Sequence, residues 1–535
     1  MGKTWDVLAP RNLELGPLAG RAEASSPWRN FKLAREEDGI AWLALDKPDA
    51  GANTLSADVL SELNDVLASL ERDPPKGLLL RSAKPAGFIA GADIGEFGGM
   101  TDTAAAEARL KEANAVVDRL DRLAVPTVAV IHGYCLGGGL EIALACDYRI
   151  AVEDARLGFP EVMLGLHPGL GGTVRLPRLI NPLEAMTMML TGRNVRASRA
   201  KSLGLVDAVV PERHVKAAAT GAVTGLMRKR RESWLIPLVN SHYGRALAAK
   251  RMRKETAKKA PVAHYPAPYA LIDLWEAHGG NAQDMQRAEI VSFARLLVTD
   301  TSRNLVRVFF LREKLKRLAG GGWSPRRVHV IGAGAMGGDI AAWCAWHGFT
   351  VTLADTQAAP LAKAIARAAD LYGKIGHRRI DARDALDRLI PDLDGEGVRS
   401  ADLVIEAVPE TLELKRKVYA ATQTKMKPDA ILATNTSSIP LEDLRFGLRR
   451  PDHFVGLHFF NPVSRMQLVE VVSHDQVSPD TLGKARAFVG RIDRLPAPVK
   501  SAPGFLVNRA LTPYMLEALA MLGEGYKRET IDAAA

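Results

Sequence analysis

The sequence is poor in cysteine, and this scarcity excludes two classes of protein. Among 535 residues only Cys135, Cys146 and Cys344 are cysteines, and no CxxC pair occurs. A disulfide framework and a thiolate zinc site both need more cysteines at closer spacing, so neither is expected. The scarcity favours a reducing, cytoplasmic location, and no metal is expected.

Long apolar runs are missing as well. No segment approaches the roughly 20 apolar residues that a membrane-spanning helix needs, so no transmembrane segment is expected. The first ten residues, MGKTWDVLAP, lack the basic start and the apolar stretch of a secretory signal. Both absences predict a soluble protein.

Acidic residues are too few to balance the basic ones. The net charge of +10 suggests an anionic partner, either a nucleic acid or a polyanionic small ligand. Much of the excess lies in one basic segment, whose cations are Arg228, Lys229, Arg230, Arg231, Lys250, Arg251, Arg253, Lys254, Lys258 and Lys259. A solvated helical face is one interpretation of this segment, and contact with a phosphate-bearing substrate or partner is another. No recognition motif accompanies the charges, so no nucleic acid partner is expected.

The composition, 47% hydrophobic and 25% charged, allows large cores. A chain of this length should form roughly two to four domains. Short apolar strands alternate with helical patterns in two stretches, and strand signals fade between them. The sequence therefore predicts a mixed α/β protein in five parts: a poorly ordered extension over 1–26, an α/β domain over 27–215, a helical linker over 216–322, a second α/β domain over 323–502 and the start of a helical domain over 503–535.

Two glutamates of the first α/β domain, Glu141 and Glu161, are surrounded in the sequence by apolar residues and glycines. Glycines 137–139 precede the helix-like run LEIALAC, so the amides of its first turn are unpaired and carry the positive end of the helix dipole. The stretch GFIAGADIGEF can present another free amide at Ala92, and two converging amides form an oxyanion hole. Burial and mutual repulsion would raise the pKa values of Glu141 and Glu161, so that one accepts a proton while the other donates one. Alternatively, the glycines only allow tight helix–strand packing.

Three segments of this domain resemble the crotonase (enoyl-CoA hydratase/isomerase) superfamily: IAGADI, HGYCLGGGLEIALACDYRIA and LGFPEVMLGLHPGLGGTVRLPRL. The resemblance implies a spiral ββα fold in which Ala92 and Gly138 donate the oxyanion-hole amides to the thioester oxygen of a coenzyme A substrate. It also implies that Glu141 and Glu161 hold and activate the water that adds across a 2-enoyl double bond. Because both glutamates are present, hydration is favoured, with isomerisation as a side activity.

A glycine-rich turn opens the second α/β domain. GAGAMG follows the strand-like RVHVI and precedes a helical pattern, as a dinucleotide site requires. Gly332 makes the turn, Gly334 lets a pyrophosphate approach and Gly337 permits close helix–strand packing. The next strand, FTVTLAD, ends in Asp355, whose carboxylate would accept from ribose hydroxyls and repel a 2′-phosphate. The pattern predicts a Rossmann domain that binds NAD rather than NADP.

His458 and Glu470 lie twelve residues apart in HFVGLHFFNPVSRMQLVEVV. Taken alone, the pair is more consistent with a core histidine beside a surface glutamate than with a catalytic pair. Together with ADLVIEAVPETLELKRKV, ATNTSSIP and PGFLVNRAL, the stretch resembles 3-hydroxyacyl-CoA dehydrogenases. The resemblance implies that His458 removes the 3-hydroxyl proton and that Glu470 orients the imidazole. It also implies substrate contacts at Ser437, Asn461 and Asn508, and a nicotinamide-side role for Glu410 and Lys415.

The order of the domains resembles the multifunctional fatty-acid oxidation enzyme of the α-subunit type. This resemblance implies that the chain hydrates 2-enoyl-CoA, oxidises the 3-hydroxyacyl-CoA with NAD to 3-oxoacyl-CoA, and pairs with a thiolase-type subunit. The family continues beyond IDAAA with helices that close over the dehydrogenase site, so we expect a truncated chain. Two alternatives stay open: a hydratase/isomerase whose dehydrogenase part is inactive, and a scaffold whose basic linker docks a partner or a membrane surface.

Overall fold

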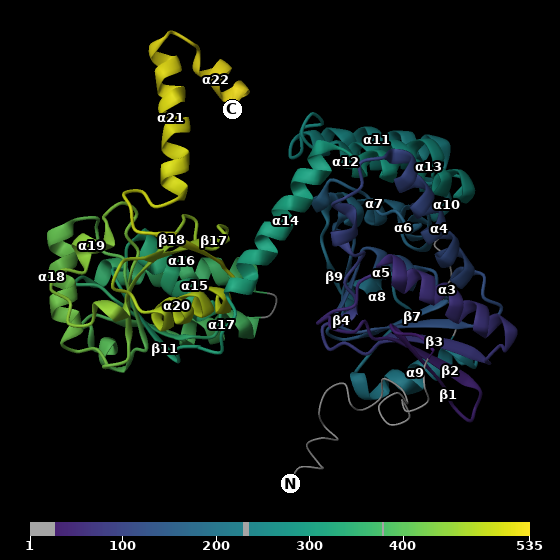
Figure 1. Cartoon of the computed structure of the whole chain (residues 1–535), viewed down its shortest axis with the longest axis horizontal. Helices are drawn as coiled ribbons and strands as arrows, with labels where there is room; N and C mark the ends of the chain where they lie inside the picture. The colour runs from purple at the N-terminus through teal and green to yellow at the C-terminus, as the bar shows by residue number, and fades with distance from the viewer. Residues whose placement is uncertain (1–26, 228–234, 377–378) are drawn as a thin grey trace. The chain divides into compact units, whose positions relative to one another are not determined.

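The computed structural model describes residues 27–227, 235–376 and 379–535. The predicted extension over 1–26 and the basic run 228–231 lie outside the described residues. The chain divides into two compact units, one ending at Phe309 and the other beginning at Phe310. Each unit is drawn in Figure 1 and is described by itself.

The first unit is built on two sheets. Six strands form the larger sheet in the order β1 (Phe31–Arg35), β2 (Ile40–Leu45), β3 (Gly77–Ser82), β5 (Thr127–Ile131), β7 (Tyr148–Val152) and β10 (Ala208–Val210). Only β1 is antiparallel to its neighbour. A smaller sheet has the order β4 (Gly87–Ile89), β6 (Tyr134–Leu136), β8 (Arg156–Gly158) and β9 (Val195–Arg196). Every residue of β2, β3 and β5 is buried, as expected for parallel strands covered on both faces.

The helices of the first unit cover both faces of its larger sheet. The inward side chains of α3 recur at helical spacing from Val59 to Leu70 and join the main core. The helices are α3 (Ala57–Arg72), α4 (Thr103–Asp121), α5 (Gly138–Leu144), α6 (Gly172–Leu179), α7 (Pro182–Thr191), α8 (Ala197–Leu203), α9 (Val215–Val223), α10 (Leu235–Val239), α11 (His242–Ala257), α12 (Pro266–His278) and α13 (Ala282–Leu297), with the short 3-10 turns η1 (Ile94–Phe97), η2 (Pro160–Leu164) and η3 (Glu212–His214). Helix α14 (Asp300–Leu318) begins in the first unit and ends in the second.

Helices from the predicted linker pack against the first α/β domain. In Figure 1, α11, α12 and α13 lie together in one layer of this unit. Leu271, Trp275 and Met285 from these helices belong to the same buried cluster as the strands. Residues up to 309 are therefore part of the first unit's packing, and the boundary at 215 stays a prediction.

The second unit holds one eight-stranded sheet. Its order is β13 (Leu389–Asp392), β12 (Thr350–Ala354), β11 (Arg327–Ile331), β14 (Leu403–Glu406), β15 (Ile431–Thr434), β16 (Phe454–Phe459), β17 (Leu468–Ser473) and β18 (Leu495–Lys500). The strands from β13 to β16 are parallel, and β17 is antiparallel to β16. The carboxyl ends of β11, β14, β15 and β16 therefore meet at one edge, where open α/β sheets bind ligands.

The helices of the second unit complete the mixed α/β architecture, which confirms the predicted fold class. They are α15 (Ala335–Trp346), α16 (Ala358–Ile375), α17 (Arg379–Asp387), α18 (Leu412–Gln423), α19 (Leu441–Leu444), α20 (Pro479–Arg491), α21 (Val507–Gly523) and α22 (Arg528–Ala534), with the short turns η4 (Glu396–Ser400) and η5 (Pro451–His453). Helix α21 extends away from the sheet in Figure 1 and buries none of its residues. Within the described ranges, no helix combines the length and the apolarity needed to cross a bilayer.

Candidate active sites

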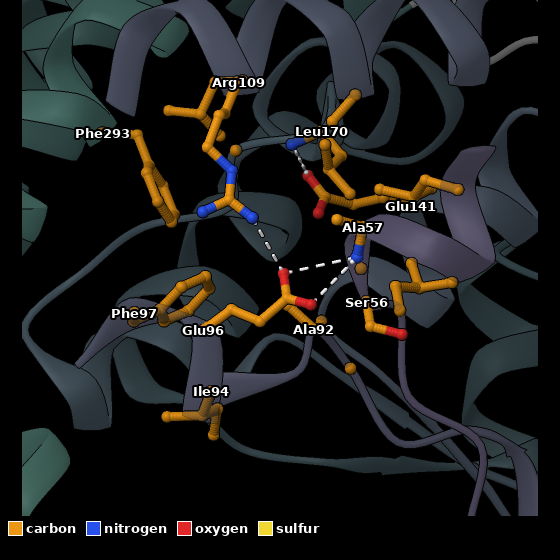
Figure 2. A pocket seen from close by; sticks show the side chains of 18 of the residues that line it. Ser56, Ala57, Ala92, Ile94, Glu96, Phe97, Arg109, Glu141, Leu170 and Phe293 are labelled. Carbon is orange, nitrogen blue, oxygen red and sulfur yellow. Dashed lines mark hydrogen bonds and ion pairs between the residues drawn. The ribbon is translucent and has the colours of Figure 1, made fainter. Parts of the chain in front are cut away.

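A cavity of about 510 Å³ opens in the first unit beside the N-terminal end of α5. Both Glu141 and Glu161 line it, and so do the predicted amide donors Ala92 and Gly138. Figure 2 shows Glu141 on one side of the cavity and the ring of Phe293 on the other. The apolar part of the wall comes from Phe97, Met100, Leu110, Leu164, Phe293 and Leu297. The first predicted site is therefore one continuous space with an apolar extension.

Glu141 is buried one turn inside α5 and is held by backbone amides. Its Oε1 accepts hydrogen bonds from Leu170 N at 2.7 Å and Gly172 N at 2.8 Å (Figure 2 shows the first). Burial raises the pKa of this carboxyl to about 7, although the two amides and the charge of Arg175 oppose the shift. Near neutral pH, Glu141 can therefore exist in either protonation state.

Glu161 lies in the 3-10 turn η2, on the same cavity. Burial raises its pKa well above the usual range, and repulsion from Glu141 adds to the shift. Its Oε2 is buried and has no hydrogen-bond partner among the described residues. A Cβ on Gly137, whose φ is +52°, would lie 2.8 Å from Glu161 Oε1, so glycine allows the carboxylate to approach the backbone. An unpartnered buried carboxyl facing a cavity is suited to binding a water molecule.

The amides of Ala92 and Gly138 lie close together at the cavity wall. A Cβ built on Gly138 would lie 3.7 Å from Ala92 N and 3.0 Å from Leu55 Cδ1. Within the described ranges, neither amide donates a hydrogen bond to the protein. Both predicted donors therefore lie on the wall of the same cavity, and neither has an acceptor among the described residues.

An ion pair fixes the wall beside these amides. Arg109 of α4 lies 3.2 Å from Glu96 of η1, and the same carboxylate accepts from Ala57 N at 3.1 Å. Figure 2 shows these contacts between Ala92 and Phe293. Three elements that line the cavity are thus tied together at one carboxylate.

The sequence analysis missed Glu289, a third buried carboxylate near this site. It lies on α13, in the segment predicted to be a linker, and is completely buried. Glu289 lies between Met285 and Phe293 at the four-residue spacing of one helix face. This spacing could have identified it from the sequence, because an acidic residue on the buried face of an amphipathic helix needs a specific partner.

The glycine-rich turn of the second unit has the geometry that a dinucleotide requires. Gly332 has φ +100°, and a Cβ there would lie 2.7 Å from Ala407 O. A Cβ on Gly337 would lie 1.8 Å from Gly332 O, whereas a Cβ on Gly334 would meet open space. Asp355 closes the turn by accepting from Ala333 N at 2.9 Å. The backbone leaves no room for a side chain at Gly337, whereas the space beside Gly334 is open. An open space beside the second glycine fits a bound pyrophosphate.

Glu410 and Lys415 join a buried network at the same edge of the sheet. Glu410 accepts from Thr436 Oγ1 at 2.5 Å and from Ser437 N at 2.8 Å, and these bonds hold its pKa below the usual value against the effect of burial. Lys415 is completely buried and lies 2.7 Å from Glu406 and 3.3 Å from Glu410. Lys415 therefore pairs with two carboxylates, one buried and one at the edge of the sheet. The sequence analysis missed Glu406, a buried residue at the end of β14.

His458 and Glu470 form a direct cross-strand pair between β16 and β17. His458 Nδ1 lies 2.6 Å from Glu470 Oε2. Glu470 Oε1 accepts from Leu506 N at 3.0 Å and Val507 N at 2.8 Å, at the start of α21. Burial opposes the ionised form of Glu470, but the bonds from His458 and Val507 hold its pKa below the usual range. A carboxylate whose pKa lies below its usual range thus contacts the imidazole.

The remaining predicted residues lie around this pair. Asn508 Nδ2 donates to Ser437 O at 3.4 Å, so the start of α21 reaches the loop after β15. Asn461 is exposed two residues beyond the end of β16. The ring of Phe505 lies 5.7 Å from the imidazole of His458, centroid to centroid. Within the described part of the chain, no three His, Cys, Asp or Glu side chains lie close enough to hold a metal ion.

Comparison with protein families gives three matches along the chain. The family described as enoyl-CoA hydratase/isomerase matches residues 35–265, the NAD binding domain of 3-hydroxyacyl-CoA dehydrogenase matches 327–502, and the C-terminal domain of the same enzyme matches 504–535.

Two whole proteins are similar to this chain over most of its length. The chain is 38% identical over 527 residues to the fatty acid oxidation complex subunit alpha of Vibrio cholerae, covering 94% of this chain and 74% of the relative. The same protein of Aliivibrio fischeri is 38% identical over 522 residues, covering 94% and 75%. Among solved structures, (S)-3-hydroxybutyryl-CoA dehydrogenase from Ralstonia eutropha is 37% identical, with 39% of this chain and 75% of that chain covered at a TM-score of 0.38.

Proposed function

The chain belongs to the family of the fatty acid oxidation complex α subunits, and from this premise we propose how its residues carry two consecutive reactions. The first unit hydrates 2-enoyl-CoA to 3-hydroxyacyl-CoA, and the second oxidises that product with NAD to 3-oxoacyl-CoA. Isomerisation of the enoyl double bond lies within the chemistry of the same hydratase family.

For hydration, the amides of Ala92 and Gly138 bind the thioester oxygen and stabilise the negative charge that develops there. Glu141 and Glu161 hold the attacking water between them. One carboxylate takes a proton from the water as its oxygen bonds to C3, and the other, protonated carboxyl donates a proton to C2. The raised pKa values of both groups support these two roles. Near neutral pH, one carboxyl of the pair can then be protonated while the other is ionised.

For oxidation, His458 removes the proton from the 3-hydroxyl group, and Glu470 orients the imidazole and stabilises its charged form. Gly332, Gly334, Gly337 and Asp355 would hold NAD, which when bound accepts the hydride from C3. Glu410 and Lys415 shape the nicotinamide end of the pocket, while Ser437, Asn461 and Asn508 position the substrate. The 2.6 Å contact between His458 and Glu470 supports this assignment.

The observation that carries the hydratase proposal is the shared cavity. Two carboxylates with raised pKa values and two unpaired amides face one space that is apolar elsewhere. Such a site polarises a carbonyl and moves protons beside it, which is the chemistry of adding water to an enoyl thioester.

A sequential assay tests the proposal. Crotonyl-CoA alone should lose its absorbance at the rate of hydration, and NAD added afterwards should give NADH from the hydrated product. Loss of crotonyl-CoA without NADH would favour the alternative in which only the hydratase works. No loss of crotonyl-CoA would contradict the assignment of the first site.

We also propose a thiolase-type partner and a cytoplasmic location. The relatives are named as subunits of a complex, and a 3-oxoacyl thioester is the substrate that a thiolase cleaves. The three cysteines are buried free thiols, which supports a reducing compartment. Co-purification of the tagged chain with a thiolase from its own cells would support the partner, and its purification without one would oppose it.

A further inference from the structure

Helix α13 contributes a carboxylate to the interior of the first unit. Asn281 caps the helix by accepting from Gln283 N and Asp284 N, which fixes where the helix begins. Its buried face packs against α4 and α6, with Met285, Glu289 and Phe293 following one another at helical spacing. Phe293 lines the cavity that Glu141 lines (Figure 2). The helix therefore reaches the site from a part of the sequence outside the resembling motifs.

Glu289 and Glu141 divide four successive backbone amides between them. Glu141 Oε1 accepts from Leu170 N and Gly172 N at 2.7 and 2.8 Å. Glu289 Oε1 accepts from Gly171 N at 2.7 Å, and its Oε2 accepts from Thr173 N at 3.1 Å and from the Thr173 hydroxyl. Even-numbered amides thus bind one carboxylate, and odd-numbered amides bind the other.

Glycine makes this alternation possible. Gly171 has φ +89°, a conformation that other residues rarely adopt, and it turns the chain at the start of α6. A Cβ on Gly172 would lie 2.8 Å from Glu141 Oε1, so only glycine lets the carboxylate reach both of its amides. The loop is therefore clamped from both sides by side chains.

We propose that Glu289 is a positioning residue of the hydratase, which fixes the 170–173 loop so that its amides hold Glu141 in the orientation needed for proton transfer. The proposal rests on the proposed function of the first site. Glu289 has no cation within ion-pair distance among the described residues, and its hydrogen bonds all go to this loop. Burying a carboxylate without a counter-ion lowers the stability of the fold, so the presence of Glu289 on the buried face of α13 supports a functional role.

The carboxylates also interact electrostatically. Burial and repulsion from Glu141 raise the pKa of Glu289 to about 8, and Glu289 in turn contributes to the raised pKa of Glu161. The other ionisable groups packed around this cluster are Arg175 of α6, which binds Asp118 of α4 at 2.7 Å, and His167, which contacts Ser292 of α13. Burial lowers the pKa of His167 to about 4, so this ring stays neutral over the working range.

The test compares Glu289→Gln and Glu289→Asp with a matched control on the same helix. Asp284→Asn removes the same charge from α13, but Asp284 is half exposed and paired only with Arg287. For Glu289→Gln we expect kcat of crotonyl-CoA hydration to fall about 10- to 100-fold with KM changed less than about threefold. The pH profile should also move toward lower pH, because ionised Glu289 no longer raises the pKa of Glu161.

The conservative variant separates positioning from folding. Glu289→Asp keeps the charge but shortens the reach, so its kcat should fall while its pH profile stays in place. Asp284→Asn should match the unaltered protein in both respects. The melting temperature of the first unit should be unchanged in all three variants, which shows that this unit is folded in each of them.

The outcomes distinguish this inference from the proposed function. If the unaltered protein does not hydrate crotonyl-CoA, the function of the first site is wrong. If it does, and Glu289→Gln keeps the original kcat and pH profile, the positioning role is overturned while the function stands. An equal loss of activity at every pH, together with a lowered melting temperature, would also overturn it and leave a purely structural role. Should Glu289→Gln fail to fold, Glu289→Asp with unchanged kcat would refute the role.

Discussion

Glu141 in the first unit and Glu470 in the second have nearly the same backbone environment but opposite pKa shifts. Both are buried, and each accepts two backbone amides at the start of a helix, α6 for Glu141 and α21 for Glu470. Yet the pKa of Glu141 is raised to about 7, whereas that of Glu470 is lowered.

The difference lies in the side chains that face each carboxylate. Glu470 has His458 at 2.6 Å, which stabilises its negative charge against the cost of burial, whereas Glu141 has no ion-pair partner among the described residues and burial raises its pKa. Burial and amide hydrogen bonds alone therefore do not decide the direction of a pKa shift. The charged neighbour decides the direction of the shift. Its absence allows Glu141 to carry a proton, and its presence keeps Glu470 ionised.

The proton-carrier role of the first pair predicts the largest effect. Glu141→Gln and Glu161→Gln should each lower hydration of crotonyl-CoA by about 10³- to 10⁴-fold, because glutamine cannot exchange a proton. Oxidation of 3-hydroxybutyryl-CoA is the control and should keep its rate. Normal hydration in either variant would remove that residue from the mechanism.

The second site predicts a somewhat smaller loss, confined to the other reaction. His458→Ala should lower NADH formation from 3-hydroxybutyryl-CoA by about 10²- to 10³-fold, since the base that takes the hydroxyl proton is lost. Hydration should be unaffected. A parallel loss of both activities would mean that the variant disturbs the whole chain rather than one site.

The substitution Gly138→Ala tests the proposed oxyanion hole of Ala92 and Gly138 and leaves both carboxylates of the first site in place. The added Cβ would lie 3.7 Å from Ala92 N, in the space proposed for the thioester oxygen. Hydration should fall about 10²-fold, as when one oxyanion donor is lost. Gly99→Ala is a suitable control, because a Cβ there meets open space. Equal rates for the two variants would argue against the oxyanion hole.

The opposite pKa shifts of Glu141 and Glu470 predict that local stability depends on pH in opposite directions around the two residues. This effect should be smaller than the losses of activity described above. The raised pKa of Glu141 gives stability that is full below its ordinary value of 4.5 and is lost as pH rises toward 7. The lowered pKa of Glu470 gives stability that is present above 4.5 and is lost as pH falls through the lowered pKa. Each pKa unit corresponds to about 1.4 kcal/mol.

Hydrogen exchange can measure both dependences in one chain. Peptides covering α5 and β17, corrected for the intrinsic effect of pH on exchange, should show slopes of opposite sign. Glu141→Gln should flatten the first slope and Glu470→Gln the second. Slopes of the same sign would contradict the comparison.

The parts of the fold and sites that carry a local sequence signal were predictable. The glycine-rich turn at Gly332 and the helix N-terminus at Gly138 follow from residues near one another in the chain, because helix geometry fixes where their amides point. The structure brings Ala92 and Gly138 to one cavity, and His458 into contact with Glu470. By contrast, Glu289 lies 148 residues from Glu141, and no local pattern relates them.

The sequence by itself determined which chemical groups this protein has: two carboxylates beside a glycine-rich helix start, a dinucleotide turn, and a histidine and a glutamate twelve residues apart. Only the tertiary structure decided that α13 belongs to the first site and that Lys415 is completely buried between Glu406 and Glu410. The physical reason is that residue types and helix periodicity are local properties of the chain, whereas burial and the identity of a charged neighbour depend on how distant segments pack.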